Sequence, residues 1–148
     1  MNESNFKRHF IEKPIYEIGR GIEVIGRQLP AMTFLNDALI PGSNNYVEFS
    51  WIYEVPNPNP LIGAHAHDTE QIVLHIGSDP KNPEALGAEV ELVIDGESYV
   101  TDRTHLFYLP KKMKHGPITW RRVDRPLIEM TIALGASTAE AVNPGGLA

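Results

Sequence analysis

The sequence predicts an all-β protein, either a barrel or a sandwich, and the distribution of turn residues and apolar side chains indicates this class. Twelve glycines and twelve prolines divide the 148 residues into short segments. Few of these segments repeat apolar residues with the period of a helix. Many short strands separated by turn residues are typical of antiparallel barrels and sandwiches. We therefore expect less than about a tenth of the residues to be helical, against the usual third.

The expected strands are segments that are rich in β-branched and aromatic residues and are bounded by turn residues. In residues 46–55, apolar side chains at odd positions alternate with polar ones, which places Trp51 and Tyr53 on the face that we expect to be buried. Asp95-Gly96 separates two strand-like segments and predicts a tight hairpin turn. In chain order, the predicted strands span residues 15–18, 32–35, 46–55, 62–67, 72–76, 88–94, 98–101, 105–109, 117–122 and 127–134.

A chain of this length is expected to form a single domain. Within it we expect N-terminal strands or an arm at residues 1–44, a barrel at residues 45–136, and a flexible tail at residues 137–148, which is rich in small residues, Gly and Pro. No segment near the N-terminus has the apolar stretch of a signal peptide, and no later run approaches the length of a membrane span. We therefore expect a cytoplasmic protein without a membrane partner.

Charge and cysteine content exclude several kinds of function. The net charge is −6, with 13 basic against 19 acidic residues. A surface that binds phosphates needs the opposite balance, so we expect no nucleic-acid partner. The chain contains no cysteine, which excludes disulfides, thiolate catalysis and Cys-ligated zinc or iron–sulfur sites. Any bound metal must therefore be held by imidazole, carboxylate, amide or water ligands.

Two histidines one residue apart are the strongest functional signal in the chain. His65 and His67 are followed by Glu70, and His115 lies much later. Alternate side chains of an extended strand share a face, so the first pair directs two imidazoles toward one point. With an oxygen ligand from the next turn and a further histidine, such a pair forms a site for a divalent metal ion. We predict this site inside a β-barrel.

These residues lie in two segments that resemble the two motifs of the cupin superfamily. The first reads His65-x-His67-x2-Glu70-x6-Gly77, against the pattern G-x5-H-x-H-x(3 or 4)-E-x6-G. The second reads Thr104-x5-Pro110-x-Lys112-x2-His115-x3-Thr119, against G-x5-P-x-G-x2-H-x3-N. The chain lacks the glycine expected at position 59, has a loop after His67 that is one residue short, and replaces two glycines and an asparagine of the second pattern. The likeness covers about residues 45–134.

The resemblance implies a jelly-roll barrel, or double-stranded β-helix, whose three histidines and one carboxylate bind iron, manganese, nickel or zinc. Proteins of this superfamily include dioxygenases, decarboxylases, lyases and isomerases, and also non-catalytic binding proteins. The resemblance further implies a homodimer that pairs through sheet faces or exchanged N-terminal strands. Residues 6–18 mix apolar and charged positions, as a strand that reaches a neighbour's sheet edge would.

Two residues compete for the position of the oxygen ligand. Counting forward from His67 by the family spacing reaches Gln71, whereas counting back from Gly77 reaches Glu70. Glu70 shares a strand face with three large aliphatic residues, and we expect the more apolar face to point into the barrel. A carboxylate is also a stronger ligand than a neutral amide. We therefore predict Glu70 as the ligand, with Gln71 as the alternative.

Three further residues are candidates for contact with a substrate. Trp51 and Tyr53 precede the histidine motif and would reach the mouth of the barrel, where Tyr53 or Glu70 would assist proton movement. Lys112 belongs to a lysine-rich turn just before His115 and would attract an anionic ligand.

We predict a metal-dependent enzyme that acts on a small oxygen-rich or carboxylate-bearing metabolite. The alternative is a cupin without catalytic activity that binds a small molecule or uses the metal to stabilise its barrel. The other histidines have no ligand spacing. Among them, we expect His75 on the outer face of its strand and His105 at the start of a strand.

Overall fold

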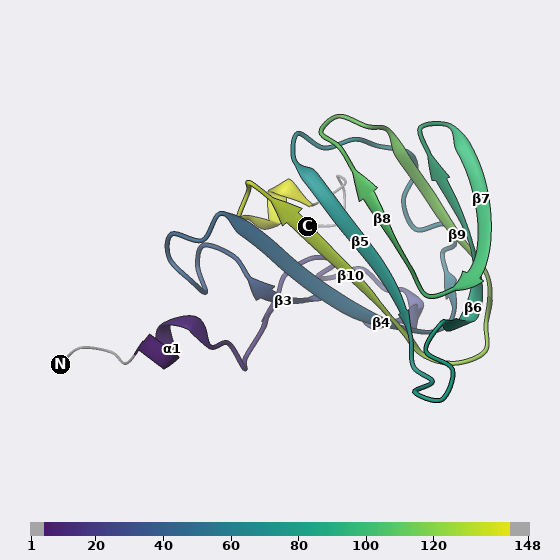
Figure 1. Ribbon diagram of the computed structural model, residues 1–148, viewed down its shortest axis with the longest axis horizontal. Coiled ribbons are helices and arrows are strands. Elements are labelled where there is room, and N and C mark those ends of the chain that lie inside the picture. The colour runs from purple at the N-terminus through teal and green to yellow at the C-terminus, as the bar shows by residue number, and fades with distance from the viewer. Residues whose placement is uncertain (1–4, 143–148) are drawn as a thin grey trace.

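The computed structural model describes residues 5–142, which form two antiparallel sheets (Figure 1). The large sheet has the strand order β1-β3-β4-β10-β5-β8, with β2 also paired to β4, and the small sheet has the order β7-β6-β9. This arrangement confirms the predicted all-β jelly roll. The strands are β1 (Ile15–Tyr16), β2 (Ile25–Arg27), β3 (Met32–Leu35), β4 (Asn45–Asn57), β5 (Glu70–Gly77), β6 (Ala85–Ile94), β7 (Glu97–Arg103), β8 (His105–Leu109), β9 (His115–Val123) and β10 (Leu127–Leu134).

The helical content of the described residues is small, as the sequence predicts. It consists of α1 (Asn5–His9) and the 3-10 turn η1 (Ala139–Ala141). None of the helices within residues 5–142 is long and apolar enough to cross a membrane.

The main core lies between the two sheets, since strands of both contribute to it. Apolar side chains of this core leave the solvent almost completely, and their burial is the main favourable term in folding. A second cluster around Tyr46 lies where the segment before β2 and the chain after β10 meet the large sheet. The buried residues of the main core are Ile52, Val73, Leu86, Ala88, Val90, Leu92, Phe107, Leu109, Trp120 and Leu127.

Most predicted strands are present, and the tight hairpin is confirmed. Asp95 and Gly96 both have positive φ angles, 50° and 79°, and they join β6 to β7 where Ile94 pairs with Glu97. The predicted strand at residues 62–67 is wrong, because only His65 makes a β-bridge there. β2 has no counterpart among the predicted strands, since its glycine interrupts the apolar pattern that marks a strand.

The predicted faces of β4 and β5 are inverted in the structure. Trp51 and Tyr53 are 37% and 49% exposed, so the prediction that they are buried is wrong. On β5, Gln71 and His75 are 2% and 0% exposed, so the expected outer position of His75 is also wrong. The inward residues include polar groups with partners inside the protein: Tyr46 bonds to Glu48 on β4, and His75 on β5 bonds to Glu129 and His105. Because these polar groups are satisfied there, hydrophobic periodicity assigns the wrong face.

The start of the predicted C-terminal tail packs against the large sheet. Val142 is 7% exposed and belongs to the cluster around Tyr46. The side-chain nitrogen of Gln71 donates to the carbonyl of Ala141 at 3.0 Å. The remaining residues of that predicted tail, 143–148, lie outside the described part of the chain.

Candidate metal centre

Three histidines from distant parts of the sequence meet in the structure. His65 and His67 lie on the loop between β4 and β5, and His115 is the first residue of β9. One side-chain nitrogen from each histidine lies within 4.8 Å of the other two. The structure therefore brings together all three histidines that the sequence predicts as ligands.

Backbone hydrogen bonds between the two motif segments position these histidines. His65 and His115 form an antiparallel bridge, with N···O distances of 2.9 and 2.8 Å. The Lys112 amide donates to the carbonyl of His67 at 2.7 Å. Lys112 has a φ of 66°, in the region that favours glycine. This backbone conformation accounts for the glycine that the cupin pattern has at this position.

The hydrogen bonds of two rings determine which nitrogen faces the site. His65 Nδ1 lies 2.9 Å from the carbonyl oxygen of Gly63, and His115 Nδ1 lies 3.0 Å from that of Met113. A carbonyl oxygen only accepts, so both Nδ1 atoms carry a hydrogen, and in the neutral ring the lone pair is then on Nε2. Metal-binding histidines usually have this arrangement, with one nitrogen on the metal and the other donating to a backbone carbonyl.

Burial favours the neutral form of two of the clustered rings. Desolvation, together with the neighbouring His65 and His115, lowers the pKa of His67 to about 4. Burial also lowers the pKa of His115. The neutral imidazole is the form that binds a metal, so these rings do not have to lose a proton first at neutral pH.

The three histidines open onto a cavity of about 130 Å³ between the sheets. Its apolar lining includes Leu29, Val73 and Phe107. The large sheet also contributes polar and charged side chains to the wall, which gives the cavity a hydrophobic body with a polar side. These polar residues are Arg27, Glu48, Ser50, Gln71, Glu129 and Thr131.

The structure places Gln71, and not Glu70, at this cavity. Gln71 is buried and lines the cavity beside the histidines. Glu70 lies on the opposite face of β5, where its carboxylate interacts with the hydroxyl of Tyr108. The expected orientation of Glu70 toward the cavity is therefore wrong, because the apolar face of β5 points outward. Spacing counted forward from His67 was the sequence signal that reached the residue lining the cavity.

The predicted substrate contacts also lie away from the cavity. Trp51 and Tyr53 are on the exposed face of β4. Lys112 is exposed, and the contact that it makes with the histidine site is through its backbone amide. The structure therefore does not bring these three side chains to the histidines.

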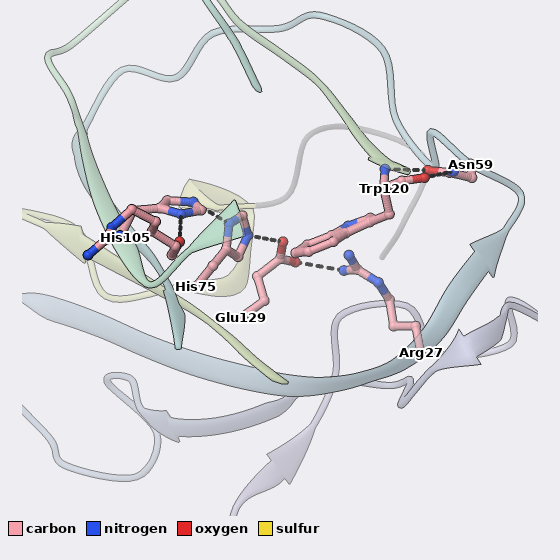
Figure 2. Close-up of polar contacts among 7 residues, drawn as sticks. Arg27, Asn59, His75, His105, Trp120 and Glu129 are labelled. Atoms are coloured by element: carbon pink, nitrogen blue, oxygen red, sulfur yellow. Dashed lines mark hydrogen bonds and ion pairs between the residues drawn. The ribbon is translucent and has the colours of Figure 1, made fainter. Parts of the chain in front are cut away.

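A buried chain of charged and polar groups extends from the cavity wall toward the surface (Figure 2). Glu129 accepts from Arg27 NH1 at 2.7 Å, and its other oxygen lies 2.7 Å from His75 Nε2. His75 Nδ1 lies 2.8 Å from His105 Nε2. Although burial by itself raises the pKa of Glu129, Arg27 and the hydrogen bond to His75 hold that pKa well below its ordinary range.

Sequence reasoning missed this network, although strand register could have revealed part of it. His75 is directly opposite Glu129 on β10 and His105 on β8, so the three residues are cross-strand neighbours. Each of these three residues, considered alone in the sequence, is of a type that often lies on the protein surface. The expected position of His105 at a strand start is confirmed, since β8 begins there.

The arrangement resembles solved structures at low sequence identity. Oxalate oxidase in complex with the substrate analogue glycolate aligns with 98% of this chain and 65% of its own, at 15% identity and a TM-score of 0.55. The polyketide cyclase RemF from Streptomyces resistomycificus aligns with 93% of this chain and 81% of its own, at 11% identity and a TM-score of 0.51. An RmlC-like cupin from Shewanella frigidimarina NCIMB 400 aligns with 82% of this chain and 90% of its own, at 18% identity and a TM-score of 0.43.

The chain has the cupin fold. It spans 65% of the oxalate oxidase chain, so it corresponds to about two thirds of that protein. No protein-family model and no curated protein matches the sequence. The histidines lie where the two motif segments of the chain pair, which agrees with the resemblance seen in the sequence.

Proposed function

We propose that His65, His67 and His115 bind one divalent metal ion, and that the protein is an enzyme that uses this ion to act on a small metabolite. The observation that carries the proposal is the convergence of three side-chain nitrogens within 4.8 Å at a cavity. Hydrogen bonds to carbonyls leave Nε2 of His65 and of His115 free to bind. Gln71 is the candidate for an additional oxygen ligand from the cavity wall.

The proposed ligands favour particular metals. Imidazole suits iron, manganese, nickel and zinc in protein sites, and an amide oxygen is compatible with the harder ions of this group. Three histidines and one amide leave coordination positions for a substrate or water. A metal bound there supplies a Lewis acid that polarises a carbonyl or carboxylate oxygen.

The size and lining of the cavity indicate the class of substrate. A volume of about 130 Å³ is well below the roughly 300–1,000 Å³ of pockets for drug-sized ligands. The polar wall suits an oxygen-rich or carboxylate-bearing molecule. The oxalate oxidase of similar fold binds glycolate, a molecule of this kind. We propose a reaction of the dioxygenase, decarboxylase, lyase or isomerase type.

Glu48 is the residue that we propose for proton transfer, in place of Glu70 and Tyr53. It lines the cavity, whereas those two residues face outward. Burial raises the pKa of Glu48 to about 7. A carboxyl group with such a pKa can both donate and accept a proton near neutral pH. The other carboxylate of the cavity, Glu129, is already engaged by Arg27 and His75.

The first test is metal content and turnover in protein purified without a nickel column. Each protein is dialysed against a solution of the metal ion, and its metal content is measured by inductively coupled plasma mass spectrometry. We expect close to one metal ion per chain in the wild type and almost none in His115→Ala. His9→Ala is the matched control, because His9 is exposed and lies in α1. Equal metal content in the wild type and His115→Ala would refute the site. Metal binding without turnover of any small carboxylic acid would favour the non-catalytic alternative.

A further inference from the structure

A second cavity, of about 90 Å³, adjoins the metal centre on the side of the small sheet. It shares His65, His115, Arg27 and Glu129 with the first cavity, and Trp120 is part of its own lining. The two cavities therefore meet at the histidines and at the Arg27–Glu129 pair. A molecule bound in the second cavity would lie next to the proposed metal ion.

Two hydrogen-bond donors at this cavity have no partner within the described residues. They are Nε of Arg27 and the indole Nε1 of Trp120, and both atoms are buried. Buried N–H groups are nearly always paired in folded proteins, so two unpaired donors on residues that line one cavity indicate a missing acceptor. A group with two acceptor oxygens, such as a carboxylate, would satisfy both.

The surrounding contacts hold these two side chains in place without using the unpaired atoms. Asn59 bonds to both the amide and the carbonyl of Trp120, at 3.0 and 2.7 Å (Figure 2). The ring of Trp120 packs edge-to-face on His75, with centroids 4.9 Å apart. Glu129 engages Arg27 through NH1. Donors that are fixed in this way bind a ligand with a smaller loss of conformational entropy.

Arg27 supplies the positive charge at this cavity. One terminal nitrogen of its guanidinium donates to Glu129 at 2.7 Å. The other oxygen of Glu129 lies 2.7 Å from His75 Nε2, so both oxygens of this carboxylate have partners within the protein. The Nε–H of Arg27 therefore remains for a further acceptor.

We propose that Arg27 and Trp120 form a carboxylate-binding subsite beside the metal centre, so that the substrate is a small carboxylic acid held by its carboxylate. The assignment of the bound acid as substrate rests on the proposed function, whereas the binding itself does not. The guanidinium attracts the anion and its Nε–H donates to one oxygen, while the indole N–H donates to the other. The rest of the acid then extends past His65 and His115 into the first cavity.

The test is isothermal titration of glycolate and malonate, with glycolamide and malonamide as uncharged analogues. We expect the wild type to bind the acids and not the amides. Arg27→Gln should weaken acid binding by roughly ten- to hundredfold, as for the loss of a charged hydrogen bond. Trp120→Phe, which keeps the ring and the charged network, should weaken it by roughly three- to tenfold. Arg121→Gln is the matched control, because Arg121 is a half-exposed partner of Glu91.

Metal titration of the same variants separates this proposal from the proposed function. Arg27→Gln and Trp120→Phe should bind metal as the wild type does, and circular dichroism should show that both are folded. Equal binding of acids and amides, absence of acid binding by the wild type at millimolar concentration, or unchanged acid binding in Trp120→Phe would overturn the subsite. Acid binding that depends on Arg27 in a protein that binds no metal would support the subsite while refuting the enzyme.

Discussion

Replacing Glu48 by glutamine should stabilise the protein above neutral pH and abolish the proposed proton transfer. Glu48 is half-buried at the cavity, and its Oε2 lies 3.2 Å from the hydroxyl of Tyr46. That hydroxyl also contacts Thr33 at 2.8 Å and Glu17 at 3.2 Å. Tyr46 has one phenolic hydrogen for two carboxylates, so its hydrogen bond to Glu48, which by itself lowers the pKa, offsets only part of the effect of burial. Glutamine has the shape of the protonated carboxyl group and retains a donor.

The pKa of Glu48 determines the magnitude and the pH range of this effect. Burial raises the pKa from 4.5 to about 7, and the Glu129 and Glu17 carboxylates also raise it. Below pH 4.5 the group is protonated in both the folded and unfolded states, so it contributes no difference. As pH rises from 4.5 to 7, only the unfolded chain releases the proton, and stability falls. Above pH 7 the loss is complete and amounts to about 3 kcal/mol, at about 1.4 kcal/mol for each pKa unit.

Urea unfolding at pH 5 and pH 8, with EDTA present to remove bound cations, measures this difference. Glu48→Gln should exceed the wild type by about 3 kcal/mol at pH 8 and by less than about 1 kcal/mol at pH 5. Taking the difference between the two proteins cancels the titration of other groups. Glu54→Gln is the control, because Glu54 is exposed on the same strand. A gain that is equal at both pH values, or a loss at pH 8, would refute the assignment of a raised pKa.

Two further predictions concern packing and assembly. Gly77→Ala should destabilise the protein by roughly 2–4 kcal/mol in urea unfolding, because the added Cβ would overlap the Ala85 carbonyl. Gly63→Ala is the control and should be close to neutral, since a Cβ there meets no atom within 4 Å. We also expect light scattering to show a homodimer, with the exposed face of the large sheet as its interface. Trp51→Glu should then convert the dimer to a monomer. A wild type that is monomeric at micromolar concentration would contradict this expectation.

Much of the fold could be predicted because turn residues and strand periodicity are local properties. Asp95-Gly96 specified its hairpin through the positive φ angles that both residues adopt. The three histidines could be predicted as a group from their spacing in the sequence. Their convergence does not depend on the predicted strand at residues 62–67, which is absent. His65 and His67 still converge with His115, since the bridge at His65 holds the two segments together.

The face of each central strand could not be predicted, because the interior of this protein is polar where the site lies. Glu129 bonds to both Arg27 and His75 across β10, β2 and β5, and these bonds allow charged groups to be buried there. Hydrophobic periodicity assumes that the more apolar face is buried, and that assumption fails when a polar network fills the interior. The side chain of Glu70 was placed on the wrong face for the same reason, since Gln71 lies on the inward face with His75.

Many of the apolar residues of these strands lie on the outer face of the large sheet. On this face, Tyr108 of β8 pairs with Ile72 of β5, and Ile72 pairs with Ile132 of β10. The next cross-strand rows toward the C-terminal end of β5, which also include β4, consist of other aliphatic and aromatic residues. Exposed side chains on this face include Leu106 and Trp51, at 54% and 37%. An apolar face of this extent is unfavourable in water and is typical of a surface that binds a partner. The alternation of apolar and polar residues along these strands thus accounts for the polar wall of the cavity on one side of the sheet and for the expected dimer contact on the other.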